Sequence, residues 1–217
     1  MNNTYIFNSL QIDNAEKFQK YYSCMSDYRR SKIDRMKMEK DKLLSLSAGI
    51  LLDSCLKKLG LRERSMKYAL GKNEKPFFTN VQGIYFNISH SGAYAVCSFS
   101  ENEIGCDIEK IESADIRIAE RFFTEGEYSY VLAGENERER SYRFIRLWTL
   151  KESCLKYKGT GLGGGLSSFE IGFIGNKPVI LNNEEELYLK EYEADGCCVS
   201  VACGSNSFSS SLVEVRL

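Results

Sequence analysis

Two acidic residues with the spacing of a β-strand are the first candidates for chemistry. The segment 104–109 alternates apolar residues with small or acidic ones, which is typical of a strand with one buried face. Asp107 and Glu109 then point to the same side, with Cα atoms about 6.5–7 Å apart. Two ionised carboxylates at that range repel by roughly 2.4 kcal/mol if the effective dielectric constant is about 20. Either water surrounds this side or a cation lies between the acids, and oxygen ligands favour magnesium over zinc.

A third acid lies in the segment 148–156. A helix is predicted over about 139–158, ended by Gly159, and it places Trp148, Glu152 and Lys156 on one face because they are four residues apart. One interpretation is an ion pair worth about 0.3–0.5 kcal/mol beside a packed tryptophan. The other is a carboxylate that completes a metal site or acts as a base, with a lysine that neutralises phosphate charge. The spacing alone does not decide between them.

A polar turn at 87–92 is a candidate anion site. Ser89, His90 and Gly92 combine a hydroxyl, an imidazole and a glycine that exposes backbone N–H groups. A Ser-His nucleophile pair is the alternative, but adjacent residues of an extended chain point apart, so the two groups are poorly placed to hydrogen-bond. We therefore interpret the turn as a phosphate contact. His90 is the only histidine, which excludes a His-rich zinc site.

The glycine-rich segment 159–165 contains a G-x-G-x-x-G sequence. A dinucleotide fingerprint follows a strand and begins a helix, whereas this segment follows a predicted helix. We expect a helix stop and a loop at the edge of an active site.

The elements that position these residues mix helices and strands without a βαβ period, which predicts the α+β class. A helix is expected over about 31–59, ended by Gly60, and a capping box at Thr124–Glu127 begins another. Two similar subdomains in a pseudo-twofold arrangement are expected, at 1–103 and 104–217, because each has a long helix followed by strands. The predicted strands are 5–7, 84–89, 94–99, 104–109, 169–174, 179–181, 198–203 and 212–215.

Composition narrows the class of protein. The chain has 217 residues, of which 43% are apolar and 27% charged, as in soluble globular proteins. No apolar run approaches the ~20 residues of a membrane span, and the start is polar, so we expect a cytoplasmic protein without a membrane partner. The eight cysteines form no C-x-x-C pair and are expected to be reduced. Residues 1–103 carry a net charge of +5 and residues 104–217 a net charge of −6, which suits an anionic ligand beside a metal or a basic partner.

Together these segments resemble the 4′-phosphopantetheinyl transferase superfamily. The similarity lies, in order, in Lys75-Pro76, the turn at 86–91, G-x-D-I-E at 105–109, the segment 122–127, W-T-x-K-E-S-x-x-K at 148–156, and the glycines that follow. The length is similar to that of the surfactin-synthetase-activating type, a monomer whose two similar halves imitate a dimer. The holo-acyl-carrier-protein synthase type is about half as long.

The resemblance implies an enzyme that transfers phosphopantetheine from coenzyme A (CoA) to a serine of an apo acyl or peptidyl carrier protein. It implies a dependence on Mg²⁺ and release of adenosine 3′,5′-bisphosphate, in support of nonribosomal peptide, polyketide or fatty acid biosynthesis. The implied metal ligands are Asp107, Glu109 and Glu152, and Glu152 is also the implied general base. Lys156 is implied to support the pyrophosphate. Ser89 and His90 are implied phosphate contacts, and Lys75 and Pro76 are implied to lie against the adenine nucleotide.

One position departs from the family pattern. Many relatives have an arginine near the start of the first long helix, where it meets the ribose 3′-phosphate, and Leu44 stands there in this chain. Lys32, Arg35 and Lys42 are the candidate substitutes. If none of them takes this role, coenzyme A is expected to bind more weakly than usual.

Two other functions compete with the transferase. A magnesium nuclease or phosphoesterase also uses three acids and a lysine, although its usual D…E-x-K order differs from the order here. A nucleic-acid module would use the basic stretch 29–42, but it leaves the acidic residues unexplained and predicts a steep loss of affinity with salt. The transferase accounts for all of these residues, and no nucleic-acid partner is expected.

Overall fold

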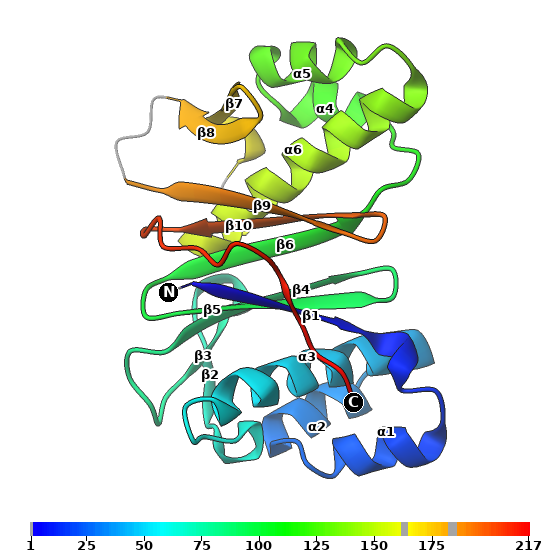
Figure 1. The fold of residues 1–217 in the computed structure, drawn as a ribbon, viewed down its shortest axis with the longest axis vertical. Helices are drawn as coiled ribbons and strands as arrows, with labels where there is room; N and C mark the ends of the chain where they lie inside the picture. The colour runs from blue at the N-terminus through cyan, green and yellow to red at the C-terminus, as the bar shows by residue number, and fades with distance from the viewer. Residues whose placement is uncertain (1, 162–164, 182–185) are drawn as a thin grey trace.

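Two β-sheets lie face to face between two layers of helices in the computed structural model, which describes residues 2–161, 165–181 and 186–217 (Figure 1). The first sheet has the strand order β11-β1-β5-β4 and the second the order β6-β10-β9, with two further pairs, β2-β3 and β7-β8. The strands are β1 Asn3–Asn8, β2 Tyr68–Leu70, β3 Pro76–Phe78, β4 Tyr85–Ser91, β5 Tyr94–Ser100, β6 Ile104–Lys110, β7 Glu170–Ile174, β8 Lys177–Leu181, β9 Tyr188–Ala194, β10 Cys197–Cys203 and β11 Val213–Glu214. The α-helices are α1 Ala15–Tyr22, α2 Asp27–Asp34, α3 Glu39–Lys57, α4 Arg117–Phe122, α5 Glu125–Leu132 and α6 Glu137–Lys158.

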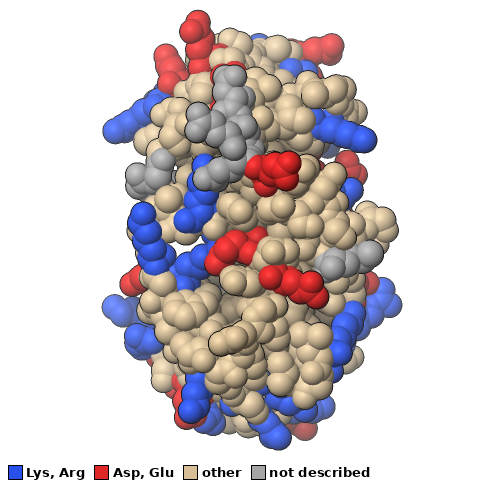
Figure 2. Space-filling view, turned by 90° about the vertical axis from the view of Figure 1, so that its left-hand side faces the viewer, with Lys and Arg blue, Asp and Glu red and all other residues tan. Residues whose placement is uncertain are grey.

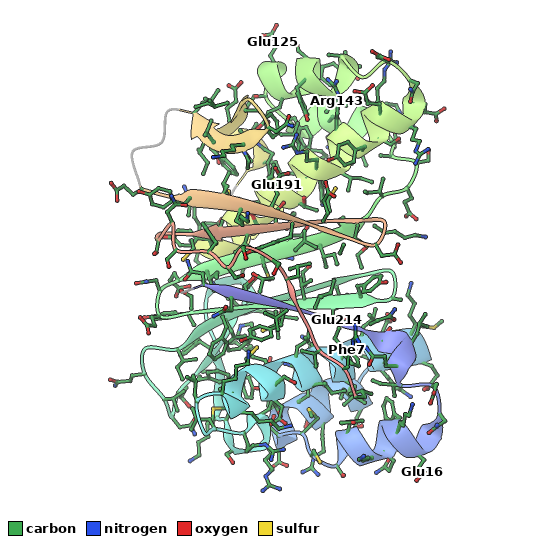
Figure 3. All side chains as sticks on the ribbon, viewed as in Figure 1. Phe7, Glu16, Glu125, Arg143, Glu191 and Glu214 are labelled. Atoms are coloured by element: carbon green, nitrogen blue, oxygen red, sulfur yellow. The ribbon has the colours of Figure 1, made fainter. Side chains whose placement is uncertain are left out.

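The core has separate layers because successive strand residues point to opposite faces. On β5, Cys97 packs with Phe7 and the α3 residues in one cluster. Its neighbour Val96 packs between the two sheets with Ile6 of β1 and Val201 of β10. Figure 3 shows Phe7, which is fully buried, on the helix side of the first sheet, and the exposed Glu16 and Glu125 at opposite ends of the molecule.

The predicted start of α5 and the predicted end of α6 are both confirmed. Thr124 begins α5, and both hydrogen bonds of its capping box with Glu127 are present. The side chain of Asn136 begins α6 by accepting a hydrogen bond from the N–H of Glu139, and Gly159 ends it in the left-handed conformation with a φ of 62°. The β4–β5 hairpin and the alternation along β6 are also confirmed. The mixture of elements confirms the α+β class, and each half has a long helix, α3 or α6, on the outer side of its sheet (Figure 1).

The helix predicted over 31–59 is wrong in its first part. The chain forms α2 and then α3, with Met38 extended before α3. The basic stretch has too few apolar residues for one continuous buried face, and α2 buries only Arg29 and Ile33. Strands β2, β3 and β9 were not predicted. β9 is an edge strand whose residues are mostly half-buried, so its apolar alternation is weak.

A strand near the C-terminus pairs across the predicted division of the chain at residue 103. Residue 103 lies just before β6, but β11 runs parallel to β1 in the first sheet, with Tyr5 opposite Val213. The end of the chain therefore returns to the sheet of the first half, although the predicted boundary assigns it to the second.

The state of the cysteines, the hydropathy of the helices and the surface charge can be compared with what the composition predicts. All eight cysteines are free thiols. Within the described ranges, no helix is both long and apolar enough to cross a bilayer. On the face shown in Figure 2, acidic side chains gather near the middle, and lysine and arginine side chains lie along both margins and at the lower end. Residues 162–164 of the glycine-rich loop lie outside the described part of the chain.

Candidate active site

Side chains of β4 join the two sheets where β4 and β6 lie side by side. Asn87, Ser89 and Ser91 alternate along β4 and reach β6. The amide oxygen of Asn87 accepts the N–H of Cys106 at 2.9 Å, and the hydroxyl of Ser91 accepts the N–H of Lys110 at 3.1 Å. β4 and β6 belong to different sheets, so these side chains replace the missing backbone ladder between them. The predicted anion turn is thereby held against the predicted acidic strand.

Gly105 allows α6 to lie directly on β6. A Cβ atom at this position would be 2.0 Å from the carbonyl oxygen of Ser153 and 2.3 Å from the backbone nitrogen of Tyr157. Only a glycine leaves room for so close a contact between strand and helix. The contact places the Glu152–Lys156 face of α6 beside Asp107, two residues along β6.

Lys156, Asp107 and Ser89 form one hydrogen-bonded group from three elements. The Lys156 ammonium is 2.6 Å from Oδ1 of Asp107 and 2.9 Å from Oγ of Ser89. Ser89 donates to the same Asp107 oxygen at 2.7 Å. Burial lowers the pKa of Lys156, but the charge and hydrogen bond of Asp107, together with Cys106 and Glu152, outweigh burial and raise that pKa. The lysine therefore remains a cation, and three predicted site residues are brought together.

Glu109 and Glu152 complete the acidic cluster. Burial raises the pKa of Glu152, and the charge of Asp107 raises it further. Burial also raises the pKa of Glu109, against the hydrogen bond that it accepts from Ser91 at 2.8 Å. The charge of Asp107 raises the pKa of both glutamates and the charge of Glu109 raises that of Glu152, while Lys156 lowers both. Side chains 45 residues apart in sequence therefore share one electrostatic environment.

The acids fit a magnesium ion that is bound partly by a substrate. Among the described residues, no group of three Asp, Glu, His or Cys side chains is arranged so that it could hold a metal ion. Mg²⁺, however, is usually bound by one or two carboxylates together with substrate phosphates and water. Oδ2 of Asp107 is buried and lacks a hydrogen-bond partner within the described part of the chain, as expected of an atom kept for a ligand. The donors are all oxygens, which suits this ion.

A cavity of about 250 Å³ lies next to the acids and has cationic walls. Lys156 lines it together with Lys32 of α2 and His90 of β4. Burial lowers the pKa of His90, and the positive charges of Lys156 and Lys32 add to this effect. Burial likewise lowers the pKa of Lys32, helped by the charge of Arg29. The charges of Lys156 and Lys32 attract an anion into the cavity, and an anion there would oppose the lowering of both pKa values.

Only some of the residues predicted to contact the nucleotide line the cationic cavity. Lys32 and Pro76 line the cationic cavity. Arg35 donates to the backbone oxygen of Ser31, and Lys42 pairs with Glu39 at 2.6 Å; neither lines the cavity. Leu44, at the position of the family's arginine, is buried in the core.

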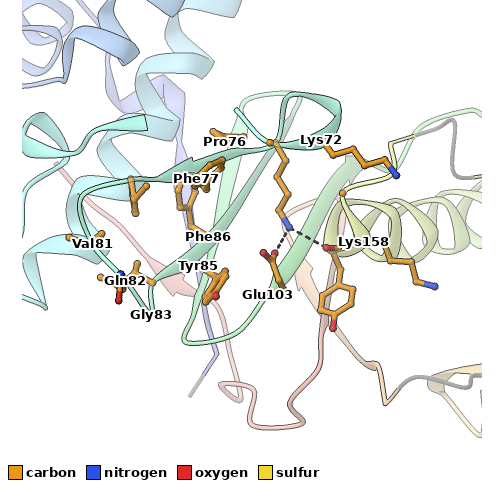
Figure 4. A pocket seen from close by; sticks show the side chains of 16 residues that line it. Lys72, Pro76, Phe77, Val81, Gln82, Gly83, Tyr85, Phe86, Glu103 and Lys158 are labelled. Atoms are coloured by element: carbon orange, nitrogen blue, oxygen red, sulfur yellow. Dashed lines mark hydrogen bonds and ion pairs between the residues drawn. The ribbon is translucent and has the colours of Figure 1, made fainter. Parts of the chain in front are cut away.

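Lys75 holds the two halves together. Its ammonium is 2.7 Å from the Glu103 carboxylate and also donates to the carbonyl oxygens of Ile104 and Tyr157. It lines a larger cavity of about 700 Å³ that has several aromatic side chains in its wall, shown in Figure 4. Its charge is thus used by the protein itself, whereas its neighbour Pro76 lines both this cavity and the cationic one.

Two cavity residues were not identified from the sequence. Arg29 and Ser45 line the cationic cavity, and both are buried. Nε of Arg29 and Oγ of Ser45 have no hydrogen-bond partner among the residues the structure describes. Arg29 precedes Lys32 by one helical turn, and Ser45 is a small polar residue in the leucine-rich α3. These sequence features are weak signals. Only the packing of α2 and α3 against β4 shows that both residues line the cavity.

Comparison with known proteins identifies the family. A model of the 4′-phosphopantetheinyl transferase superfamily matches residues 103–202, and a model of the N-terminal part of 4′-phosphopantetheinyl transferase matches residues 13–102. The chain is 30% identical over 195 residues to 4′-phosphopantetheinyl transferase Sfp of Bacillus subtilis (strain 168), covering 88% of this chain and 87% of that protein.

Other relatives agree. The 4′-phosphopantetheinyl transferase ffp of Bacillus subtilis is 31% identical over 184 residues, which are 83% of this chain and 82% of that protein. The 4′-phosphopantetheinyl transferase gsp of Aneurinibacillus migulanus is 39% identical over 126 residues, which are 57% and 52% of the two chains. These matches confirm the family and the enzyme class predicted from the sequence. The chain belongs to the 4′-phosphopantetheinyl transferase superfamily.

Proposed function

We propose that this enzyme transfers 4′-phosphopantetheine from coenzyme A to a serine of an apo acyl or peptidyl carrier protein and releases adenosine 3′,5′-bisphosphate. One observation carries the proposal: Lys156 belongs both to the acidic cluster, through Asp107, and to the wall of the cationic cavity. A single residue thus connects a place for phosphate with a place for acid–base and metal chemistry. Coenzyme A carries a pyrophosphate and a separate ribose phosphate, so its transfer reaction needs both a place for phosphate and a place for metal and acid–base chemistry.

The cationic cavity is proposed to receive the nucleotide. Lys32, His90 and Arg29 supply positive charge or hydrogen-bond donors for the 3′-phosphate, and the unpartnered hydroxyl of Ser45 adds a further donor. Lys32 is favoured over Arg35 and Lys42 because it alone of the three lines the cavity. Pro76 offers an apolar surface for the adenine at the edge of the same cavity.

The acidic cluster is proposed to hold Mg²⁺ through Asp107, Glu109 and Glu152. When bound, this ion neutralises the pyrophosphate charge that would repel an incoming alkoxide. The unpartnered Oδ2 of Asp107 is the donor that supports this assignment most directly. Lys156 contributes a fixed positive charge beside it for the phosphate group that leaves.

Glu152 is proposed to accept the proton of the carrier serine. Its pKa is raised by burial and by Asp107, and a base works best when its pKa lies close to the working pH. The serine oxygen bonds to the phosphorus that bears pantetheine, and the bond from that phosphorus to the bridging oxygen breaks. The electron pair leaves with adenosine 3′,5′-bisphosphate, while Glu152 holds the serine proton directly or through a water molecule.

A third cavity supports a path for the pantetheine arm. This cavity of about 320 Å³ begins at Glu109 and is lined by Ile118, Phe144, Ile145 and Trp148. An uncharged, amide-bearing chain suits an apolar floor with polar edges. Because the acids and the cationic cavity all come from one chain, we further propose a monomer, acting in the cytoplasm.

The test is to incubate apo carrier proteins with coenzyme A and Mg²⁺ and to measure the intact mass of the carrier. We expect a gain equal to one phosphopantetheine, lost when Mg²⁺ is chelated and lost in Glu152→Ala. Chromatography should show adenosine 3′,5′-bisphosphate in an equal amount. Carriers that stay unmodified across a panel of acyl- and peptidyl-carrier domains would overturn the proposal.

A further inference from the structure

Two serines of β4 contact two acids of β6 in parallel ways. Ser89 donates to Oδ1 of Asp107 at 2.7 Å, and Ser91 donates to Oε2 of Glu109 at 2.8 Å. The serines are two residues apart on one strand and the acids two residues apart on the other, so the pairs repeat with the period of the strands. Ser89 lies in the proposed substrate cavity, whereas Ser91 has no role in the mechanism described above.

The direction of the Ser91 hydroxyl is determined by its second contact. Its oxygen accepts the backbone N–H of Lys110 at 3.1 Å. A hydroxyl has a single proton to donate, and with an N–H on one side that proton is directed to Glu109 on the other. Ser91 therefore holds Oε2 of Glu109 in a defined place, and the second carboxylate oxygen is the one presented to a ligand.

The Ser91 hydroxyl also provides a hydrogen-bond partner for a backbone N–H at the edge of β6. The N–H of Lys110 faces β4 at a place where the two strands share no backbone ladder. Without the hydroxyl, this N–H loses its partner and the Glu109 side chain becomes free to rotate about its side-chain torsions. Both effects would move the same carboxylate.

We infer that Ser91 is a positioning residue that orients Glu109 for the divalent metal ion and so sets the metal affinity of the site. This inference rests on the proposed function, in which Glu109 is a metal ligand. It predicts an effect on metal binding that is larger than the effect on coenzyme A binding or on folding. Partners that orient a metal ligand typically affect metal affinity by about 10–100-fold.

The test measures Mg²⁺ binding directly, by calorimetric titration of Mg²⁺ into enzyme with coenzyme A and without a carrier. We expect Ser91→Ala to weaken Mg²⁺ binding by at least about 10-fold and to raise the half-saturating Mg²⁺ concentration for transfer similarly. At saturating Mg²⁺ its kcat should return close to that of the wild type. Ser91→Thr keeps the hydroxyl and should restore Mg²⁺ binding.

Ser9→Ala is the matched control. Ser9 donates to the carbonyl oxygen of Ala93 in the turn of the same hairpin at 2.8 Å but touches none of the acids. It should lower the melting temperature without changing Mg²⁺ binding. If Ser91→Ala does not fold, Ser91→Cys, whose thiol is a weak donor, replaces it in the comparison.

Two results would overturn the inference: unchanged Mg²⁺ affinity in the Ser91 variant, or an equal loss in Ser9→Ala. These failures differ from a failure of the proposed function. In that case the wild type itself would not modify a carrier in the presence of Mg²⁺.

Discussion

The ammonium of Lys156 on α6 lies 2.6 Å from the Oδ1 atom of Asp107 on β6. This contact links the long helix to the strand that bears two of the acids. Asp107 is 4% exposed and Lys156 is 28% exposed at the side chain, so the pair is mostly withdrawn from water. We therefore expect the stability of the fold and the proposed function to depend on the same two residues.

Removing the lysine should leave a buried carboxylate without its counter-charge. We expect Lys156→Met to lower the free energy of unfolding by about 3 kcal/mol, measured by urea denaturation. The double variant Lys156→Met with Asp107→Asn should recover most of that loss, because a neutral amide no longer needs the cation. A double variant no more stable than the single one would contradict this account.

Glu152 should destabilise the folded protein when it is ionised. Its pKa is raised on folding by burial and by Asp107. Well below the ordinary glutamate pKa both states are protonated and no penalty exists, whereas the penalty grows as the pH rises through the raised value. Glu152→Gln should therefore raise the melting temperature at neutral pH but not at low pH, while abolishing transfer. The exposed Glu112→Gln is the control, and an equal gain there would refute the explanation.

The glycine of the G-x-D-I-E segment should tolerate no side chain. In Gly105→Ala the added Cβ meets the backbone of α6, which must move away from β6. We expect a loss of about 1–3 kcal/mol in stability and a loss of transfer activity, since Lys156 and Glu152 move with the helix. Gly71→Ala, where the nearest atom is at 3.4 Å and φ is −85°, should cost much less.

The three basic candidates for the 3′-phosphate should differ in effect. Lys32→Ala should raise KM for coenzyme A by about tenfold, the equivalent of ~1.4 kcal/mol, because Lys32 lines the cavity. With dephospho-coenzyme A, which lacks that phosphate, the variant and the wild type should become similar. Arg35→Ala and Lys42→Ala remove the same charge elsewhere and should leave KM almost unchanged. An equal effect in all three variants would indicate only long-range electrostatics.

A second buried ion pair should matter for stability alone. Lys151 and Glu127 are both fully buried and bonded to each other. The Lys151 ammonium also donates to the carbonyl oxygen of Phe169, and Glu127 accepts the N–H of Ile171. Lys151→Met should lower the free energy of unfolding by about 3–5 kcal/mol in urea denaturation. The exposed pair of Lys17 and Asp13 is the control, where Lys17→Met should cost less than about 1 kcal/mol.

Local patterns in the chain determined many of the elements and most of the proposed chemistry. The alternation along β6 and the four-residue spacing of Glu152 and Lys156 depend only on the periods of strand and helix. The capping box at Thr124 and the left-handed Gly159 are likewise properties of a few consecutive residues. Their positions could therefore be predicted without knowing what packs against them.

Only the tertiary structure decided which distant residues meet. The return of β11 to β1, the contact of Ser91 with Glu109, and the meeting of Arg29 and Ser45 in one cavity depend on the packing of separate elements. The break between α2 and α3 also arises there, because a basic stretch becomes helical only where a few of its residues find a core. Such non-local contacts leave no periodic signal in the chain, which is why the acids, Ser89 and Lys156 were predicted as site residues but their contacts with one another, and the contact of Ser91 with Glu109, were not.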